Sequence, residues 1–373
     1  MNKKVIITGA GGQDGSYMSE YLLKNTDYKI IGTIRRTSQP ILSNLCNCLS
    51  NNRFSLSPMD LTDVHSIMSL IDKEKPDYFI NFAASSFVAD SWNQPTFTME
   101  ANSISLIHIL ESVKKYVPHC RVYSAGSSEQ WGNVIYSPQD ENHPMRPRSI
   151  YGVSKCAAFY TCKVYRESYG LYVVHGIVAN HESPRRQLHF VTRKITTGVA
   201  NIFNSIVNNK PVVPFSLGNL NAKRDWSDAE DVVDAVWRML NQEEYILKTF
   251  LEKNKSHFRI GGKFIPTDYV VGSGENHSLR EFVEKAFELI GFDGEWHGKG
   301  IDETYWVYRN KSVDAPTLCA VKVDPKFYRP AEVDILCANS SRIRDELGWT
   351  PKTNFEGLID KMITNDLKKY NNL

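Results

Sequence analysis

Tyr151 and Lys155 lie four positions apart in the stretch SIYGVSK, which places both side chains on one face of a predicted helix. A lysine beside a phenol favours the phenolate and lowers the pKa of the tyrosine, so Tyr151 is predicted to act as a base near neutral pH. Ser127 ends the apolar stretch before this helix, where its hydroxyl can hydrogen-bond the same substrate hydroxyl. The spacing also occurs in ordinary surface helices, but the three side chains together predict oxidation of a hydroxyl group.

A carboxylate follows two positions after that serine. Glu129 stands in SAGSSEQWG, among small residues typical of a turn that would not need it. Oxidation of a hydroxyl requires only Ser127, Tyr151 and Lys155, so Glu129 adds a second base near the same substrate. It could remove a proton made acidic by a newly formed ketone, which predicts loss of water after oxidation. The alternative is a glutamate that caps a helix or is merely solvated.

A glycine loop follows the first predicted strand. The stretch TGAGGQDG places Gly9, Gly12 and Gly15 between that strand and a predicted helix, with Gln13 and Asp14 inside the loop. The first glycine permits a tight turn, and Gly12 lets the backbone approach a pyrophosphate at the helix N-terminus. A plain strand–helix turn is the alternative, but this position in the chain predicts a dinucleotide site.

The end of the second predicted strand selects the dinucleotide. An NAD site would carry an acidic residue there to hold the ribose 2′-hydroxyl, whereas this strand ends in Arg35 and Arg36. Two guanidinium groups suit a 2′-phosphate, which a carboxylate would repel. NADP is therefore the predicted cofactor, and an exposed charged turn is the alternative.

Two further turns are candidate cofactor contacts. Asp60 and Leu61 follow the third predicted strand, where they can contact an adenine edge. After the fourth, NFAASS supplies small residues, among them Ala83, Ser85 and Ser86, where backbone must pass close to a cofactor. By itself, each of these segments is only a turn.

Repeated strand–helix–strand units must position these residues. Apolar, β-branched stretches predict strands over Lys3–Thr8, Tyr28–Ile34, Arg53–Asp60, Asp77–Ala83, Cys120–Gly126 and Leu171–Ala179. Helical spacing predicts helices over Gly15–Lys24, Thr62–Lys73, Pro95–Tyr116 and Ser149–Tyr169. This alternation predicts an α/β protein with a Rossmann-like, doubly wound parallel sheet.

The pattern loosens after about residue 180. VVPFSLGN and DYVVGSG are typical of short strands, and Ser278–Gly291 predicts an amphipathic helix closed by glycine. Asn254–Pro266 and Glu295–Val321 have no strong period and are predicted to be loops. We therefore expect an NADP-binding domain over residues 1–180, to which parts of 210–240 return, and a smaller C-terminal α/β substrate-binding lid over 181–373.

Composition excludes several classes of protein. The 373 residues carry 44 basic and 42 acidic side chains, a net charge of +2, so no broad basic field predicts nucleic acid or an anionic membrane as partner. No apolar run approaches the roughly eighteen residues of a membrane span. Seven cysteines with scattered spacing suit free thiols in a reducing compartment and no metal site. We expect a soluble cytoplasmic protein without a metal.

At this level the sequence closely resembles the GDP-mannose 4,6-dehydratases of the extended short-chain dehydrogenase family, over nearly the whole chain. The resemblance includes ITGAGGQDGSY, RRTS, SSE, YGVSK, NHESPRR, FVTRKI, LGNLNAKRDW and FYRPAEVD. It implies NADP contacts at Gly9 to Gly15, Arg35, Arg36, Asp60, Leu61, Ala83, Ser85, Ser86, Lys155, His181 and Arg186. It implies catalytic roles for Ser127, Glu129, Tyr151 and Lys155.

The resemblance further implies a site for a GDP-sugar. Its residues are Ser128, Asn180, Lys194, Arg224, Arg329 and Glu332. Lys194 and Arg224 would pair with the pyrophosphate, and Glu332 could accept guanine N–H donors, while Arg329 has the alternative of bracing a loop. The resemblance also implies a homo-oligomer, a dimer or tetramer, in which the stretch after the arginine pair reaches a neighbouring subunit's cofactor.

The sequence departs from the family pattern near the sugar and the lid. Leu-Tyr-Gly after the glutamate is replaced by Gln130, Trp131 and Gly132, a cofactor-side tyrosine is Phe97, and Lys248–Phe264 resembles an insertion. A GDP-manno-heptose, longer by one hydroxymethylene, is therefore an alternative substrate to GDP-mannose. A GDP-sugar C4 oxidase or reductase and a catalytically silent NADP-binding regulatory protein are the alternative functions.

Overall fold

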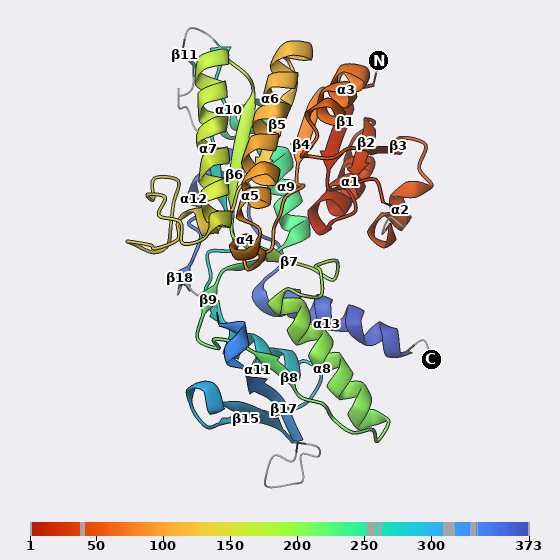
Figure 1. The fold of residues 1–373 in the computed structure, drawn as a ribbon, viewed down its shortest axis with the longest axis vertical. Helices are drawn as coiled ribbons and strands as arrows, with labels where there is room; N and C mark the ends of the chain where they lie inside the picture. The colour runs from red at the N-terminus through yellow and green to blue at the C-terminus, as the bar shows by residue number, and fades with distance from the viewer. Residues whose placement is uncertain are drawn as a thin grey trace.

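The computed structural model describes residues 2–37, 42–251, 259–260, 263–308, 318–328, 333 and 335–371. Figure 1 shows two units: a larger one with helices on both faces of a central sheet, and a smaller one formed by later parts of the chain. The N-terminus lies in the larger unit and the C-terminus in the smaller one (Figure 1).

The central sheet has seven strands, all parallel, in the order β13-β6-β5-β4-β1-β2-β3. They are β1 (Lys4–Thr8), β2 (Lys29–Ile34), β3 (Phe54–Pro58), β4 (Tyr78–Asn81), β5 (Arg121–Ala125), β6 (Val173–Val178) and β13 (Tyr269–Val271). The first six fall within the predicted strands, and β13 falls within DYVVGSG. The strand order reverses at β1, as in a Rossmann-like sheet, so the predicted fold is confirmed.

Helices cover both faces of this sheet, which explains why several of its strands are mostly apolar. In β1, Val5 and Ile7 enter a core with α1 (Gln13–Asn25) and α9 (Ala229–Leu240). Ile6 enters the opposite core with α3 (Val64–Glu74), α6 (Ser105–Tyr116) and α7 (Ile150–Tyr169). Other helices of this unit are α5 (Pro95–Met99), α10 (Gln242–Leu251) and α12 (Ser341–Leu347). A π-helical turn, η2 (Glu100–Ile104), interrupts the helix predicted over Pro95–Tyr116.

The smaller unit has a core of its own. Its helices are α8 (Val191–Val207), α11 (Leu279–Glu288) and α13 (Phe355–Asn371), and its sheet has the order β15-β16-β17-β8. The predicted helix over Ser278–Gly291 is confirmed as α11. Ser278 and Glu281 form a capping box, which fixes where the helix begins. Phe282 and Phe287 of this helix are fully buried against α8, α13 and the sheet.

The loop predicted over Glu295–Val321 is wrong where the segment is described, and residues 309–317 lie outside the described residues. The segment contains most of β15 (Gly294–His297), all of β16 (Thr304–Val307) and part of β17 (Leu318–Val323), whereas β8 spans Phe215–Leu217. Buried Tyr305 and Val307 alternate with half-buried Thr304 and Trp306 along β16, so a period of two was present but too short to stand out. The loop predicted over Asn254–Pro266 also contains β11 (Arg259–Ile260) and β12 (Lys263–Phe264), and residues 254–258 and 261–262 lie outside the described residues.

Residues after 180 contribute to both units. Helix α9, within the 210–240 stretch, packs on α1, while β13 pairs with β6 and α12 contacts β13. Short elements complete the fold: η1 (Ser43–Leu45), α2 (Cys46–Leu49), α4 (Asp90–Asn93), η3 (Ser128–Gln130), β7 (Asn180–Glu182), β9 (Lys223–Arg224), β10 (Trp226–Asp228), β14 (His277–Ser278), η4 (Gly300–Asp302), η5 (Pro325–Phe327) and β18 (Ile335–Leu336). Among the described residues, we find no helix with the length and apolarity of a membrane span and no group of side chains arranged to hold a metal ion.

Candidate active site

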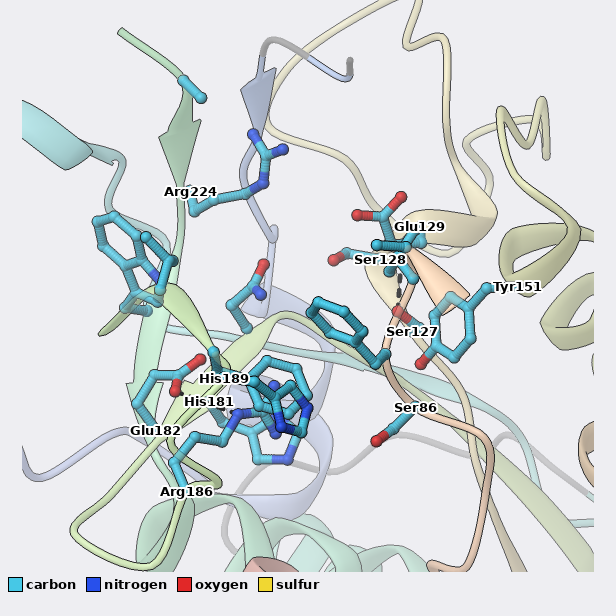
Figure 2. Close-up of a pocket in the computed structure, with 18 of the residues that line it drawn as sticks. Ser86, Ser127, Ser128, Glu129, Tyr151, His181, Glu182, Arg186, His189 and Arg224 are labelled. Carbon is cyan, nitrogen blue, oxygen red and sulfur yellow. Dashed lines mark hydrogen bonds and ion pairs between the residues drawn. The ribbon is translucent and has the colours of Figure 1, made fainter. Parts of the chain in front are cut away.

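A cavity of about 810 Å³ lies at the carboxyl ends of the central strands, between the two units. Parallel strands end at one edge of the sheet, which is where ligands bind in doubly wound folds. The predicted residues that line it are Asp14, Ser86, Ser127, Ser128, Glu129, Tyr151, Lys155, Asn180, His181, Arg186, Lys194 and Arg224. Figure 2 shows Ser127, Glu129 and Tyr151 gathered on one side, with Arg224 and the group around Arg186 on others.

The turn after β5 carries two of the candidate catalytic groups. Ser127 is the N-cap of η3, and its Oγ accepts a hydrogen bond from the backbone N–H of Glu129 at 3.3 Å. The Glu129 side chain lines the cavity. The cap of the turn is thus Ser127, not Glu129.

Tyr151 lies in the first turn of α7. Ser149 is the N-cap of this helix, and its side chain accepts a hydrogen bond from the backbone N–H of Gly152. The Tyr151 phenol points toward the Ser127 hydroxyl (Figure 2). Burial raises the pKa of Tyr151 to about 12, although the hydrogen bond with Ser127 lowers it, and the charge of Glu129 adds to the rise. The lowered pKa predicted for Tyr151 is therefore wrong for the protein chain itself.

The position of the Lys155 ammonium explains this difference. Its Nζ donates to the carbonyl oxygen of Ala125 at 2.6 Å and lies 5.7 Å from the centre of the Tyr151 ring. Burial lowers the pKa of Lys155 to about 8, against the charge of Asp14, which raises it. The Lys155 side chain is thus hydrogen-bonded to the end of β5, one helical turn beyond Tyr151. Its pKa of about 8 lies close to neutral pH.

The glycine loop has the shape that the sequence predicted. Gly9 has a φ of +66°, which favours glycine, and the N–H of Gly12 donates to its carbonyl at 2.9 Å. A side chain at Gly15 would come within 2.4 Å of that carbonyl oxygen, and one at Gly9 within 3.2 Å of Ala83. The bare loop ahead of α1 therefore fits the pyrophosphate of a dinucleotide.

Asp14 and His181 join the glycine loop to β7. Asp14 Oδ2 lies 3.0 Å from His181 Nε2, while Gln13 donates to Asp14 at 3.0 Å and to the His181 carbonyl at 3.1 Å. Burial opposes ionisation of Asp14, but the His181 charge and hydrogen bond outweigh it and lower the pKa to about 2. Burial likewise lowers the pKa of His181, yet Asp14 raises it overall. The pair holds the glycine loop against β7.

Arg186 extends this group into the cavity. Its Nε lies 3.2 Å from Glu182 Oε2, and its guanidinium stacks 3.6 Å from the centre of the Phe190 ring. Glu182 also accepts a hydrogen bond from Thr192 at 2.6 Å, so its carboxylate is fixed from two sides. The arginine is therefore held in one orientation beside the cofactor loop.

The residues predicted for the adenosine end lie outside the cavity. Arg35 and Arg36 are exposed after β2, and Leu61 is buried after β3. Asp60 accepts two hydrogen bonds from Thr62, which lower its pKa, and the charge of Arg35 lowers it further. Ser38, the last residue of RRTS, lies outside the described residues.

Ser85 does not line the cavity, and its backbone is held by hydrogen bonds to the π-helical turn η2. The Asn102 side chain accepts from the Ser85 N–H at 2.8 Å and donates to its carbonyl at 3.1 Å. The same amide donates to Ser154 Oγ, which in turn donates to the carbonyl of Tyr151. Asn102 thus connects the loop after β4 to the catalytic helix, and the extra residue of a π turn is a feature frequent at functional sites.

Cationic side chains line the opposite end of the cavity. Lys194 of α8 lies 3.3 Å from the centre of the Phe327 ring, and its pKa is lowered by burial and by the charge of Lys326. Buried Arg224 donates to the carbonyl of Val333 at 2.7 Å. Arg329 and Glu332, which the resemblance also implied, lie outside the described residues.

Several cavity residues were not among those predicted from the sequence. Lys326 adds a second ammonium beside Lys194, and Phe87, His189 and Phe190 form an aromatic cluster with ring centres 4.5 to 5.6 Å apart. These residues come from irregular segments without a period. The available signal was their position next to predicted residues, since His189 follows Arg186 and Lys326 precedes FYRPAEVD.

Comparisons with known proteins agree with this geometry. The family profile described as GDP-mannose 4,6 dehydratase matches residues 6–261 and 262–362. A curated GDP-mannose 4,6 dehydratase from Drosophila melanogaster is 38% identical over 376 residues, covering 98% of this chain and 87% of that protein.

Solved structures share the fold at low identity. The dTDP-glucose 4,6-dehydratase from Bacillus anthracis, in complex with NAD, has a TM-score of 0.72 at 19% identity and covers 99% of this chain and 98% of its own. RMD from Pseudomonas aeruginosa, complexed with NADPH, has a TM-score of 0.70 at 19% identity, with 99% and 100% covered. From the sequence match over nearly its full length, we conclude that the chain belongs to the GDP-mannose 4,6-dehydratase family.

Proposed function

We propose that the protein converts GDP-D-mannose into GDP-4-keto-6-deoxy-D-mannose, with internal hydride transfer through NADP. The observation that carries this proposal is the placing of Glu129 on the same short turn as Ser127, with both side chains lining the cavity beside Tyr151. Ser127 and Tyr151 can assist oxidation of a substrate hydroxyl, and Glu129 is a separate carboxylate base at the same cavity. Together they support a reaction in which the sugar is first oxidised and then loses water.

In the proposed reaction, Tyr151 takes the proton of the sugar O4, and Ser127 hydrogen-bonds that oxygen and orients it. Held by the glycine loop, His181 and Arg186, NADP would supply the acceptor for the C4 hydride and the donor of the hydride to C6. In this reaction the Lys155 ammonium, 5.7 Å from the centre of the Tyr151 ring, turns from the Ala125 carbonyl toward the phenol and favours loss of its proton. Glu129 then takes the C5 proton, made acidic by the C4 ketone. Glu129 or Ser128 delivers a proton to the departing C6 hydroxyl.

The cationic end of the cavity supports the GDP part of the substrate. Lys194, Lys326 and Arg224 supply the charge that a diphosphate requires. The test is to incubate the purified protein with GDP-mannose and with GDP-manno-heptose separately and to identify the products by mass. Loss of water from GDP-mannose is expected. Exclusive use of the heptose would favour the alternative substrate, and a stoichiometric change in NADP(H) without loss of water would favour a C4 oxidase or reductase.

NADP is proposed over NAD because Arg35 and Arg36 stand where a 2′-phosphate would lie. In the variant with Arg35→Asp and Arg36→Ala, NADP affinity is expected to fall about 10-fold or more, since charge-assisted hydrogen bonds are lost. Titration calorimetry with NADP and NAD measures the preference. Lys29→Ala, at the exposed start of the same strand, is the matched control and should change neither affinity. Equal affinity of the unaltered protein for both cofactors would contradict the proposal.

A homo-oligomer is proposed on the exposed apolar stripe of α7. Val153, Tyr160 and Val164 are 39%, 55% and 53% exposed and lie on one helical face. Light scattering is expected to give a multiple of 42.5 kDa, and Tyr160→Asp with Val164→Asp should give monomers that keep their helical content. Val207→Asp, equally exposed on α8, is the control. A monomeric mass for the unaltered protein would refute the homo-oligomer.

We also propose a cytoplasmic location, supported by the seven free thiols.

A further inference from the structure

Two polar side chains lie fully buried beneath the turn that carries Ser127 and Glu129. Gln130, the last residue of η3, turns its side chain back toward the sheet, and His175 points up from the middle of β6. Gln130 Oε1 lies 2.9 Å from the backbone nitrogen of Ser127 and 2.9 Å from His175 Nε2. One carbonyl oxygen therefore contacts both the catalytic turn and the strand beside it.

The hydrogen-bond roles in this group follow from one fixed donor. A backbone N–H can only donate, so the Gln130 atom facing Ser127 must be the oxygen. That oxygen accepts, and therefore His175 Nε2 carries a proton. His175 Nδ1 is then an acceptor, and Ser124 Oγ lies 3.2 Å from it, in position to donate. Burial lowers the pKa of His175 to about 3, so the ring is neutral and a single tautomer is held.

The strand below is itself fixed by charge. The backbone N–H of His175 donates to Asp268 Oδ1 at 2.7 Å, and Arg166 binds both oxygens of that carboxylate at 2.8 and 2.6 Å. All three residues are buried. A bidentate ion pair resists rotation, so the histidine backbone has little freedom to move.

The fit between the turn and the pair leaves no spare space. A side chain at Gly126 would lie 2.3 Å from His175 Nε2 and 2.7 Å from Gln130 Oε1. The N–H of Gly126 also donates to the carbonyl of Gly176 at 2.8 Å. The chain leaving β5 thus rests directly on the amide and the imidazole.

We propose that Gln130 and His175 are positioning residues, which hold the backbone of Ser127 so that its hydroxyl meets Tyr151 and Glu129 faces the substrate. The inference rests on the proposed dehydratase reaction. Its link to chemistry is short: Ser127 Oγ bonds both the Glu129 N–H and the Tyr151 phenol, so any rotation at Ser127 moves two catalytic groups. A displacement of about 1 Å at such a site costs about 100-fold in rate.

The test compares two substitutions of nearly equal size. Gln130→Met removes the acceptor, and kcat is expected to fall about 100-fold, with KM for the GDP-sugar and NADP affinity unchanged. Gln130→Glu keeps an oxygen at the same place and should restore most of the rate. A Gln130→Met protein that unfolds at lower temperature yet turns over at the original rate would overturn the inference and leave the pair a purely structural contact. Loss confined to KM would overturn it equally.

A second measurement separates this inference from the proposed function. Nitrogen NMR of the histidine rings, with His175 assigned by comparison with His175→Gln, should show a proton fixed on Nε2 in the unaltered protein. Crystals of Gln130→Met should show Ser127 Oγ displaced from Tyr151. If the unaltered protein dehydrates neither GDP-sugar, the proposed function fails. The positioning role is then decided by the crystals of Gln130→Met alone. Ser127 left in its original place would refute that role, and a displaced Ser127 would support it.

Discussion

Glu129→Gln is expected to stop the reaction halfway. Oxidation at C4 needs Ser127, Tyr151 and Lys155, all of which remain, so the absorbance of NADPH should still rise in a stopped-flow trace. Elimination needs a carboxylate to take the C5 proton, and an amide cannot accept it at neutral pH. Formation of the 6-deoxy product should fall by about 100-fold or more, which is the usual contribution of a positioned base.

Deuterium exchange identifies the step that is lost. In heavy water the unaltered protein should place deuterium at C5, and the Glu129→Gln protein should accumulate NADPH without exchange. Glu129→Asp, which keeps the carboxylate on a shorter stem, is the control and should retain part of both signals. Product formed by the glutamine variant at nearly the original rate would assign Glu129 to the turn alone.

Tyr151→Phe is expected to abolish the first step. The phenol is the group beside Ser127 that can accept the O4 proton, so single-turnover formation of NADPH should fall by about 100- to 10,000-fold. Binding should persist, because Lys194 and Arg224 lie at the other end of the cavity. Fluorescence titration with GDP-mannose measures the binding, and NADPH absorbance measures the step.

Another tyrosine of the same helix provides the control for Tyr151→Phe. Tyr165 donates from its hydroxyl to Glu111 at 2.6 Å and lies outside the cavity lining. Tyr165→Phe also removes one hydroxyl from α7, and it should leave the rate of NADPH formation unchanged. If both variants form NADPH at the original rate, Tyr151 is not the base.

The larger unit could be predicted from sequence because its signals are local and strong. Strands buried on both faces are mostly apolar, as Val5–Ile7 and most of Val173–Val178 are, with His175 as the polar exception in the second. The glycine loop could also be predicted from the sequence. The positive φ of Gly9 excludes most side chains, so the turn requires a glycine at this position. Residues close together in the chain, such as Ser127 with Glu129 and Tyr151 with Lys155, could therefore be assigned to one site.

The rest depends on contacts that no short stretch displays. Strand β16 has only four residues, Thr304–Val307, too few to establish a period. The ammonium of Lys155 was expected to act on Tyr151, but it bonds the carbonyl of Ala125, thirty positions earlier in the chain. A separation of 45 positions hid the pairing of Gln130 with His175, because neither residue type suggests the other until β5 and β6 lie side by side.

The return of the chain to its first unit has a consequence for protein engineering. A fragment ending near residue 180 would lose β13 from the edge of the sheet and α9 from one of its faces, exposing Val174 and Tyr123 to water. The two units are therefore interleaved, and neither can be excised as a continuous piece. A chimera that exchanges the sugar-binding half with that of a relative would need matched junctions at each passage between the units, including those before α9 and around β13. Substrate preference in this chain is better altered by substitutions on the cavity wall than by exchange of whole segments.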